Sequence, residues 1–258
     1  MAARHAELGR PVHDRPGCAT EFYQSVFGWE IHLTGGQTGQ YSNCLLEGRP
    51  VAGLGSLPPG DPEPGWTTHL AVEDADQAVS AIVANGGTIV TAPTQIADEG
   101  RFAVAQDPTG AFFGLWQAGS HIGAQVVNQP GAMVWNECLS SEPERARRFY
   151  AAVFGYTYTP IDGAGDYTTI DGDGPGGTVG GIGQLPASAP AQVPSHWRTY
   201  FEVADADEAA DRTSAAGGTV VVRPSDTPFG RIAVLRDPQG AVFSVLQATG
   251  AADAAAQG

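Results

Sequence analysis

The sequence predicts an α+β fold of four modules, each a strand, a helix and three further strands (βαβββ), forming two tandem domains with curved, cup-shaped sheets. The main observation is an internal repeat. Trp66–Asp76 (WTTHLAVEDAD) returns as Trp197–Asp207 (WRTYFEVADAD), and Gly100–Gln117 returns as Gly230–Gln247. Within each half the strand–helix pattern starts again near these tryptophans. A colinear copy of this length indicates that a whole domain has been duplicated.

The elements of the first half follow from the spacing of apolar residues and from the turn residues between them. They are a helix at Cys18–Phe27, strands near Tyr41–Leu46 and Val51–Leu57, a strand at Trp66–Glu73, a helix at Asp76–Asn85, and three strands that end at Gln117.

In the second half, a strand at 133–141 precedes a helix that has Pro143 in its first turn and ends at Gly155. A hairpin is expected to pair 167–170 with 179–185. The pattern restarts at Trp197, its helix ends at a glycine pair, 217–218, and three strands follow as far as Gln247. We therefore expect domains at 1–120 and 132–250, a linker at 121–131 and a flexible tail at 251–258.

Composition limits the classes of function. Hydrophobic residues make up 42% of the 258 residues, enough for a packed core in each domain, and no apolar run reaches the roughly 18 residues of a membrane span. The N-terminus lacks the apolar stretch of a signal peptide. We predict a cytoplasmic protein in which Cys18, Cys44 and Cys138 are reduced, partly buried thiols. A net charge of −15 argues against nucleic acid and membrane as partners. It is interpreted first as an aid to solubility, and the alternative is that it favours encounter with a cationic small molecule.

Several motifs together resemble those of a known superfamily. Four βαβββ modules, the helix ends FYQSVFGW and FYAAVFGY, a V-x-D strand end and a DP-x-G-x-x-F turn resemble the vicinal oxygen chelate superfamily of glyoxalases, bleomycin-resistance proteins and extradiol dioxygenases. The linker sequence GLWQAGSHIGAQVVNQPGAMVWNECL is similar to that of two-domain glyoxalase-like proteins of actinobacteria. That group includes accessory proteins of aromatic polyketide clusters.

The resemblance implies a divalent metal, but the expected ligand positions carry unsuitable residues. Superfamily enzymes place a Glu directly after the Phe of the last strand, where this chain has Gly114 and Ser244. The middle ligand position holds Thr67 in the first half and Arg198 in the second, and the first-strand position of the second half holds Trp135. A divalent ion needs oxygen and nitrogen donors, so we predict no metal.

In the first half, the first-strand position is blurred by an insertion, and His5 is its nearest equivalent. An off-register metal site formed by His5, Glu7 and His69 is the alternative.

Strand parity predicts which side chains share the former metal face of each cup. A face with flat aromatic rings and few polar groups suits a planar, largely apolar ligand. Trp135 is the first choice for a ligand contact, since it replaces a metal ligand, and the glycine and serine in the floor are expected to open room. The predicted ligand-binding residues are Trp135, Glu137, Arg198, Tyr200, Glu202 and Ser244 in the second half, and His5, Glu7, Thr67, His69, Gly114 and Trp116 in the first.

Other prominent residues are interpreted as structural. We expect Trp66 and Trp197 to pack in equivalent places of the core, and Arg101 and Arg231 to form ion pairs. Surface or loop positions are expected for His13, His32 and His121, while His196 at a strand start stays ambiguous. Four phenylalanines should join helix to sheet, namely Phe22, Phe27, Phe149 and Phe154.

Three functional hypotheses remain open. The first is metal-free binding of a hydrophobic aromatic molecule, such as an anthracycline-like polyketide, for drug sequestration or as an accessory factor to a biosynthetic oxygenase. The second is a glyoxalase-like lyase, isomerase or hydroxylase-type enzyme, with Glu137 and His69 as the acid–base candidates. The third is an accessory factor that binds a cytochrome P450 or another oxygenase through its surface. No cofactor is expected, because no G-x-G-x-x-G opens a helix after a strand and no P-loop motif occurs. Both a monomer and a homodimer are compatible with the sequence.

Overall fold

The computed structural model describes residues 2–8, 17–34, 41–57, 64–172, 177–190 and 192–248, with the side chains at 2–8, 17–18, 33–34 and 56–57 excepted. The predictions for His13 and for the tail at 251–258 lie outside these residues. Within the described ranges, no helix is long and apolar enough to cross a membrane.

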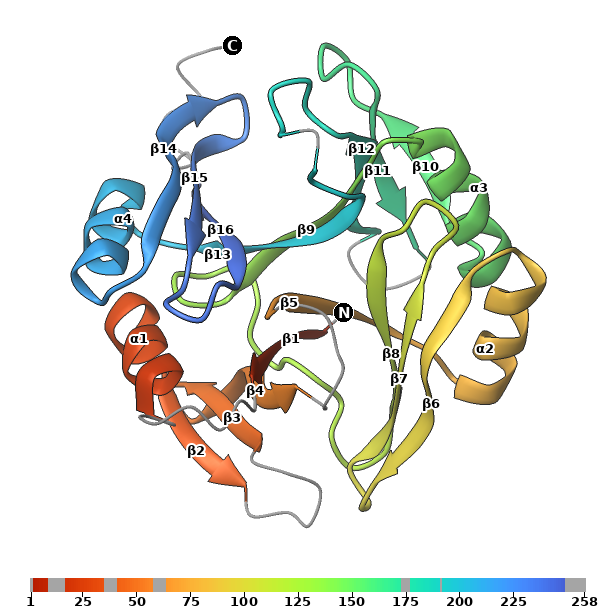
Figure 1. Cartoon of the computed structure of the whole chain (residues 1–258), viewed down its shortest axis with the longest axis horizontal. Coiled ribbons are helices and arrows are strands. Elements are labelled where there is room, and N and C mark those ends of the chain that lie inside the picture. The colour runs from red at the N-terminus through yellow and green to blue at the C-terminus, as the bar shows by residue number, and fades with distance from the viewer. Residues whose placement is uncertain are drawn as a thin grey trace. The chain divides into compact units, whose positions relative to one another are not determined.

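The predicted succession of four βαβββ modules is confirmed (Figure 1). The first half contains β1 (Ala2–Leu8), α1 (Gly17–Phe27), β2 (Glu30–Thr34), β3 (Tyr41–Leu46), β4 (Arg49–Leu57), β5 (Trp66–Ala71), α2 (Ala75–Ala84), β6 (Thr88–Ile96), β7 (Gly100–Gln106) and β8 (Phe112–Ala118). The second half contains β9 (Met133–Ser140), α3 (Pro143–Phe154), β10 (Thr157–Pro160), β11 (Tyr167–Asp171), β12 (Thr178–Gln184), β13 (His196–Glu202), α4 (Ala206–Ala215), β14 (Thr219–Thr227), β15 (Gly230–Arg236) and β16 (Val242–Gln247). The sequence had not located β2 and β10.

The modules combine across the two halves into two compact units. The central unit contains residues 67–123 and 135–198, and the terminal unit contains residues 3–66, 124–134 and those from 199 onward. Each unit therefore takes one module from each half. Helices α2 and α3 pack together in the central unit, and α1 and α4 pack together in the terminal unit.

Each module contributes four neighbouring strands to a sheet, with its helix on one side of them. The strand orders are β5-β8-β7-β6 and β10-β11-β12-β9 in the central unit, and β2-β3-β4-β1 and β13-β16-β15-β14 in the terminal unit. In every module the first strand pairs in parallel with the last, and the remaining pairs are antiparallel. The side of each sheet away from the helices is called its helix-free face below.

Aromatic side chains join helices and sheets within each unit. In the central unit the ring of Phe113 on β8 makes edge contacts with Phe149 and Tyr150 on α3. In the terminal unit Phe27 of α1 contacts Phe201 and Phe243. Full burial of such side chains contributes about 1.5–3 kcal/mol each, so these contacts between the halves are a main source of stability.

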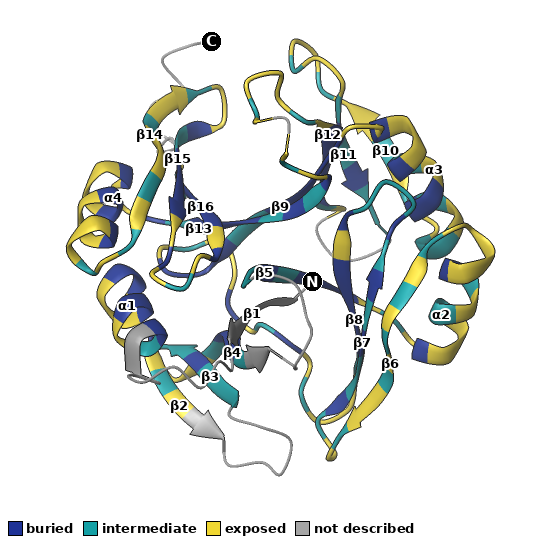
Figure 2. Cartoon of the chain, viewed as in Figure 1, coloured by how far each residue is buried: buried dark blue, intermediate teal, exposed yellow. Residues whose placement is uncertain are grey.

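The core of each unit consists of buried residues on the helices and on the strands that they cover, and some strands, such as β8, carry consecutive buried residues on both faces (Figure 2). This confirms the core role predicted for Phe22, Phe27 and Phe149, while Phe154 is partly buried against the same core. Cys44 and Cys138 are free thiols as predicted, but they are fully buried in the core instead of partly buried.

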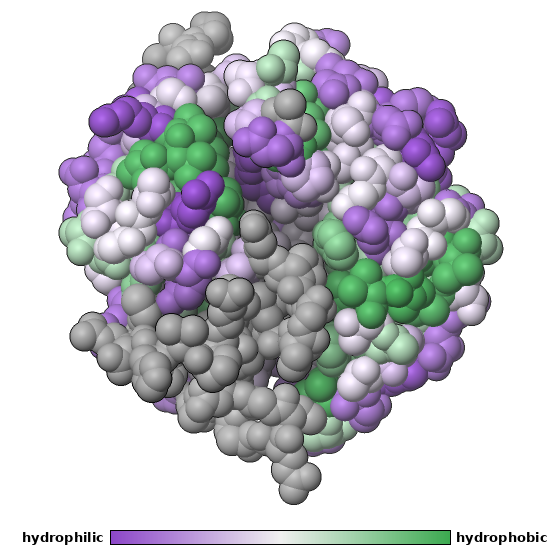
Figure 3. All heavy atoms as spheres, in the orientation of Figure 1, coloured by the Kyte–Doolittle hydropathy of each residue, from purple (hydrophilic) through white to green (hydrophobic). Residues whose placement is uncertain are grey.

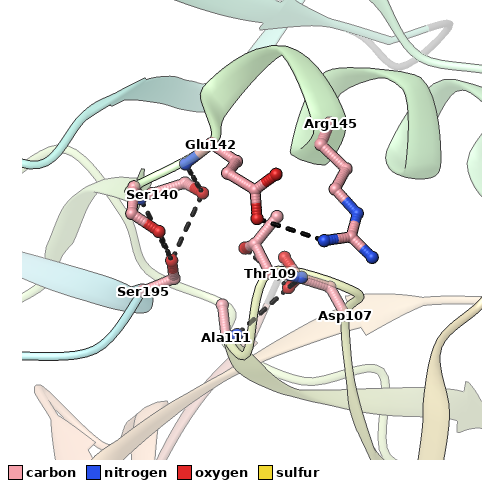
Figure 4. A network of polar contacts seen from close by, with 8 residues as sticks. Asp107, Thr109, Ala111, Ser140, Glu142, Arg145 and Ser195 are labelled. Atoms are coloured by element: carbon pink, nitrogen blue, oxygen red, sulfur yellow. Dashed lines mark hydrogen bonds and ion pairs between the residues drawn. The ribbon is translucent and has the colours of Figure 1, made fainter.

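A buried polar network occurs twice, once in each unit. In the central unit Trp197 Nε1 donates to Tyr150 Oη at 2.7 Å, and Tyr150 Oη donates to Asp107 Oδ2 at 3.1 Å. The other Asp107 oxygen accepts from the amides of Thr109 and Ala111, which closes the turn between β7 and β8 (Figure 4). Desolvation by burial raises the pKa of Tyr150, so its hydroxyl remains a donor at neutral pH.

The terminal unit repeats the network with Trp66, Tyr23 and Asp237. Trp66 Nε1 donates to Tyr23 Oη at 3.1 Å, and Tyr23 Oη donates to Asp237 Oδ2 at 2.9 Å. The prediction that Trp66 and Trp197 belong to the core is confirmed, since both are 6% exposed.

Side chains fix the helix starts. Asp74 caps α2 by accepting from the amides of residues 76 and 77, and Asp205 caps α4 by accepting from Glu208 N. At α3 the hydroxyl of Ser140 accepts from Glu142 N at 3.0 Å and lies 3.3 Å from the Ser195 hydroxyl (Figure 4).

The two repeated arginines form ion pairs, as predicted. Arg101 contacts Asp76 at 2.8 Å, and Arg231 contacts Asp207 at 2.7 Å and Asp226 at 2.8 Å.

Candidate functional site

The helix-free face of β13, β16 and β15 in the terminal unit carries three of the predicted ligand-binding residues. Two rows of side chains cross this face, Tyr200–Ser244–Val234 and Glu202–Leu246–Ile232. Tyr200 and Val234 are each 8% exposed, whereas the members of the second row are half-buried. The face thus combines an aromatic ring, aliphatic side chains and two polar groups.

Ser244 contributes a hydroxyl group without a hydrogen-bond partner. The residue is 0% exposed, and its Oγ is buried and unpaired. Leaving a buried hydroxyl unsatisfied costs about 1–3 kcal/mol, and such groups are rare in folded proteins. A bound ligand atom or a water molecule on this face would supply the missing partner.

Glu202 adds a carboxyl group to the second row. Desolvation raises its pKa above the ordinary value, because burial disfavours the charged form. Two backbone hydrogen bonds to the segment before β9 hold it in place: Glu202 N donates to Ala132 O at 2.8 Å, and Glu202 O accepts from Gly131 N at 2.9 Å. A partly desolvated carboxylate in a fixed place is suited to pair with a cationic group.

Arg198 lies on β13 two residues before Tyr200, within the central unit. Its Nη2 contacts His196 Nε2 at 3.1 Å, while its Nε is buried without a partner. His196 Nδ1 donates to Pro194 O at 2.9 Å, so Nε2 can accept from the guanidinium. Burial and the neighbouring Arg198 lower the pKa of His196. The position that holds a metal ligand in the superfamily is therefore occupied by a cation bound to a neutral imidazole.

Trp135 and Glu137 lie on β9 in the central unit, beside an unpredicted tyrosine. Trp135 is half-buried, and its Nε1 donates to Tyr167 Oη at 2.9 Å. The ring of Tyr167 covers Gly181 and Gly183, at which a Cβ would overlap it. Glu137 pairs with Gly181 in the register and is 8% exposed. This face is consequently lined by two aromatic rings and one carboxylate.

The tyrosine over two glycines recurs in the terminal unit. Tyr41 on β3 covers Gly53 and Gly55 on β4 in the same way. Sequence analysis missed both tyrosines, although each G-x-G pair (GLG and GIG) lies in the strand that follows one beginning with Tyr. Glycine in a strand often marks such a close approach.

His69 fills the space that Gly114 was predicted to open. The two residues are neighbours on β5 and β8, and a Cβ at Gly114 would overlap the imidazole. His69 is 4% exposed, and its Nδ1 lies 3.0 Å from Thr67 O. Because a carbonyl oxygen only accepts, Nδ1 carries the proton. The expectation of free room above Gly114 is wrong, since the ring of the adjacent strand occupies it.

Trp116, the next predicted residue on this face, is also enclosed by the protein. It is 3% exposed, lies over Gly100 and donates through Nε1 to His121 O at 2.9 Å. The His121 ring makes an edge contact with it, with 5.8 Å between centroids. His121 is half-buried in the segment after β8, and His32 is exposed on β2, not in a loop.

His5 and Glu7 lie on β1, and their side chains are outside the described residues. The register pairs His5 with Leu54 and Glu7 with Ser56, whereas Arg4 pairs with Gly53. Leu54 is a core residue and Gly53 lies under Tyr41. By register, His5 and Glu7 therefore take positions of the Leu54 face of the sheet, which differs from the strand parity assumed in the sequence analysis.

The residues at the superfamily's metal positions do not fit a divalent cation. Gly114 has no donor and is covered by His69, while Arg198 places a positive charge at the middle position. Among the residues that the structure describes, no group of three or more His, Cys, Asp or Glu side chains is arranged to hold a metal.

Comparison with known proteins assigns the family. The model of the Glyoxalase/Bleomycin resistance protein/Dioxygenase superfamily matches residues 14–115, and that of a glyoxalase-like domain matches residues 122–246. The protein named "Putative glyoxylase CFP32" of Mycobacterium tuberculosis is 43% identical over 89% of both chains. The anthracycline biosynthesis protein DnrV of Streptomyces peucetius is 33% identical over 98% of this chain and 95% of its own.

Solved structures share the fold at low sequence identity. The Mn(II)-bound glyoxalase from Novosphingobium aromaticivorans superposes with a TM-score of 0.62 at 15% identity, over 95% of this chain and 80% of that one. The 2,3-dioxygenase LapB from Pseudomonas sp. KL28 gives a TM-score of 0.62 at 14% identity, over 95% and 90% of the two chains. With two family models and full-length relatives in agreement, the chain belongs to the Glyoxalase/Bleomycin resistance protein/Dioxygenase superfamily.

Proposed function

We propose that the protein binds a planar, hydrophobic aromatic small molecule, of the kind represented by anthracycline-like polyketides, without a metal. The observation that carries this proposal is the helix-free face of β13, β15 and β16. It presents the Tyr200 ring, an unpaired Ser244 hydroxyl and the Glu202 carboxylate among aliphatic side chains. Sites for small molecules combine apolar walls with a few fixed polar groups in this way.

The apolar part of this face continues toward the edge of the sheet. Val222 on β14 pairs with Val234 and is 50% exposed, and Phe229 is exposed in the turn between β14 and β15. Figure 3 shows hydrophobic surface over these strands. An aromatic ligand stacked on a tyrosine gains about 0.5–1.5 kcal/mol beyond the burial of its area.

The relatives support a ligand of this class. DnrV and DauV are both named as anthracycline biosynthesis proteins, and each matches nearly the whole chain. A binding protein of this kind would serve drug sequestration and self-resistance, or would relieve product inhibition of a biosynthetic oxygenase such as a cytochrome P450. The acidic net charge of −15 favours encounter with ligands that carry an amino sugar.

The test is a fluorescence titration of the purified protein with doxorubicin, an anthracycline whose rings are fluorescent. Saturable binding with a Kd below roughly 1 mM, equivalent to about −4 kcal/mol, is expected. Tyr200→Ala should weaken it, whereas Tyr200→Phe, which keeps the aromatic ring, should retain most of it. Absence of saturation up to that concentration would refute the proposal.

The runner-up is a glyoxalase-like enzyme acting on a small carbonyl or polyketide substrate. Glu202 favours it, because desolvation raises the pKa of its carboxyl group and so makes the carboxylate a stronger base. Glu137 and His69 are further candidates. Turnover of a hemithioacetal substrate that is lost in Glu202→Gln or Glu137→Gln, together with a stoichiometric metal in the purified protein, would favour the enzyme.

A further inference from the structure

We propose that the chain binds one ligand and not two, on the helix-free face of β13–β16, because the repeat-equivalent face of β5–β8 is closed by the protein's own side chains. The inference rests on the proposed binding function and assigns its location and stoichiometry. It follows from comparing the two faces position by position, since Tyr200, Ser244 and Leu246 correspond in the repeat to His69, Gly114 and Trp116.

The first difference between the two faces lies in the row His69–Gly114 and its counterpart Tyr200–Ser244. On the β5–β8 face the imidazole of His69 lies directly over Gly114, and its Nδ1 is tied to Thr67 O at 3.0 Å. On the β13–β16 face the corresponding neighbours are Tyr200 and Ser244, and the Ser244 hydroxyl has no partner. On the β5–β8 face the imidazole of His69 thus fills the space over Gly114, whereas on the β13–β16 face the Ser244 hydroxyl lacks a hydrogen-bond partner within the protein.

The second pair of rows differs in access. On the β5–β8 face Trp116 is 3% exposed and is capped by His121, through both a hydrogen bond and an edge contact of the rings. The capping segment is itself fastened, because the amides of Gly119 and His121 donate to Glu99 O at 2.8 and 3.1 Å. A ligand would have to displace this segment to reach the tryptophan.

At the position that corresponds to Trp116, the β13–β16 face carries a smaller and more accessible side chain. Leu246 stands there in place of the tryptophan, with Ile232 beside it, and all members of this row are half-buried. Glu202 stands where the first half has Ala71, so a carboxylate occurs on this face alone of the two. Steric access and a partner for a cationic substituent therefore coincide on the same face.

The test combines native mass spectrometry with fluorescence titration, using doxorubicin as the probe. The wild-type chain is expected to show one ligand mass per chain at saturation. Tyr200→Ala should lower the affinity at least tenfold, whereas Phe102→Ala, which alters the β5–β8 face beside Trp116, should keep the wild-type affinity. Glu202→Gln provides a second, near-isosteric variant in case Tyr200→Ala does not fold, as judged by near-ultraviolet circular dichroism, and it should weaken binding of this amine-bearing probe at least threefold.

Two ligand masses on the wild-type chain, or a loss of affinity in Phe102→Ala with none in Tyr200→Ala and Glu202→Gln, would overturn the single-site assignment while leaving the binding function intact. No ligand mass on any variant, together with no saturation in the titration, would instead remove the proposed function itself.

Discussion

At the scale of single residues, the helix-free faces show where side-chain chemistry departs from what stability alone would select. Ser244 buries a hydroxyl without a partner, and Glu202 holds a carboxyl group that burial keeps partly desolvated. Positions of this kind are expected where a protein gives up stability for a function. They lead to predictions in which stability and binding change in opposite directions.

Ser244→Ala is the simplest case. Removing the unpaired hydroxyl should leave the free energy of unfolding unchanged or raise it, by up to about 1–3 kcal/mol, while weakening ligand binding. Urea denaturation and doxorubicin titration measure the two effects. A variant that lost stability would show that the hydroxyl has a structural partner.

Glu202→Gln should change how the free energy of unfolding depends on pH, because it removes the desolvated carboxyl group. The folded-state pKa is raised, so the folded state binds more protons than the unfolded state, and wild-type stability falls as pH rises from the unfolded pKa through the folded one. The glutamine variant lacks this loss. Its stability relative to wild type is expected to be higher at pH 7 than at pH 4 in urea denaturation, and an equal difference at both would contradict the burial of the charge.

Gly114 and His69 should be energetically coupled. The methyl group of Gly114→Ala overlaps the imidazole and is expected to cost about 1–3 kcal/mol through overpacking. In the His69→Ala background the same substitution should cost much less. A double-mutant cycle on the free energy of unfolding tests the contact, and additive effects would contradict it.

The sequence showed which residue types stand at these positions, but it did not show which side chains fill the space around them. The resemblance to the superfamily identified Gly114 and Ser244 as replacements of a carboxylate, and the repeat placed the two residues at equivalent positions. It gave no sign that a side chain from the adjacent strand covers the glycine, because that depends on the register between β5 and β8. The same limit applies to His5 and Glu7, whose row is decided by pairing with β4.

At the scale of elements, long segments with clear periodicity were predicted and short polar strands were missed. All four helices were located within a few residues of their bounds. The missed strands β2 (EIHLT) and β10 (TYTP) are only five and four residues long and carry polar or exposed side chains. They form because an antiparallel neighbour, β3 or β11, supplies their hydrogen bonds, which a periodicity argument does not detect.

The buried Trp–Tyr–Asp network connects elements of the two halves and should contribute measurably. Tyr150→Phe leaves Asp107 Oδ2 and Trp197 Nε1 without the phenol, so a loss of about 1–3 kcal/mol in the free energy of unfolding is expected. Tyr156→Phe is the matched control, because this tyrosine is half-buried outside the network. Burial alone raises its pKa to about 12, with no contribution from a hydrogen bond. Equal losses in the two variants would argue against the network.

At the scale of the whole molecule, the cross-half assembly of the units was beyond sequence analysis. Both copies carry the same core residue types, such as FY on the helix and F on the last strand, so either pairing satisfies the pattern. Only the contacts settle it, with Tyr23 bonded to Asp237 and Tyr150 bonded to Asp107.

This assembly predicts that the halves stay together without a covalent link. A protease site inserted beside Ile122, which is 69% exposed, should be cleavable in the folded protein. The two fragments are expected to co-elute in size-exclusion chromatography and to appear as one complex in native mass spectrometry. Separation of the fragments under native conditions would contradict units shared between the halves.

The shared units also determine when the chain can fold during synthesis. The aromatic face of α1 packs on Phe201 and Phe243, which leave the ribosome only after most of the chain has been made. Until then the nascent first half exposes Phe22, Tyr23 and Phe27 without their partners, a state in which chains are prone to aggregate. Dependence on a ribosome-associated chaperone should therefore be greatest while the second half is being translated, and it should end once β16 emerges.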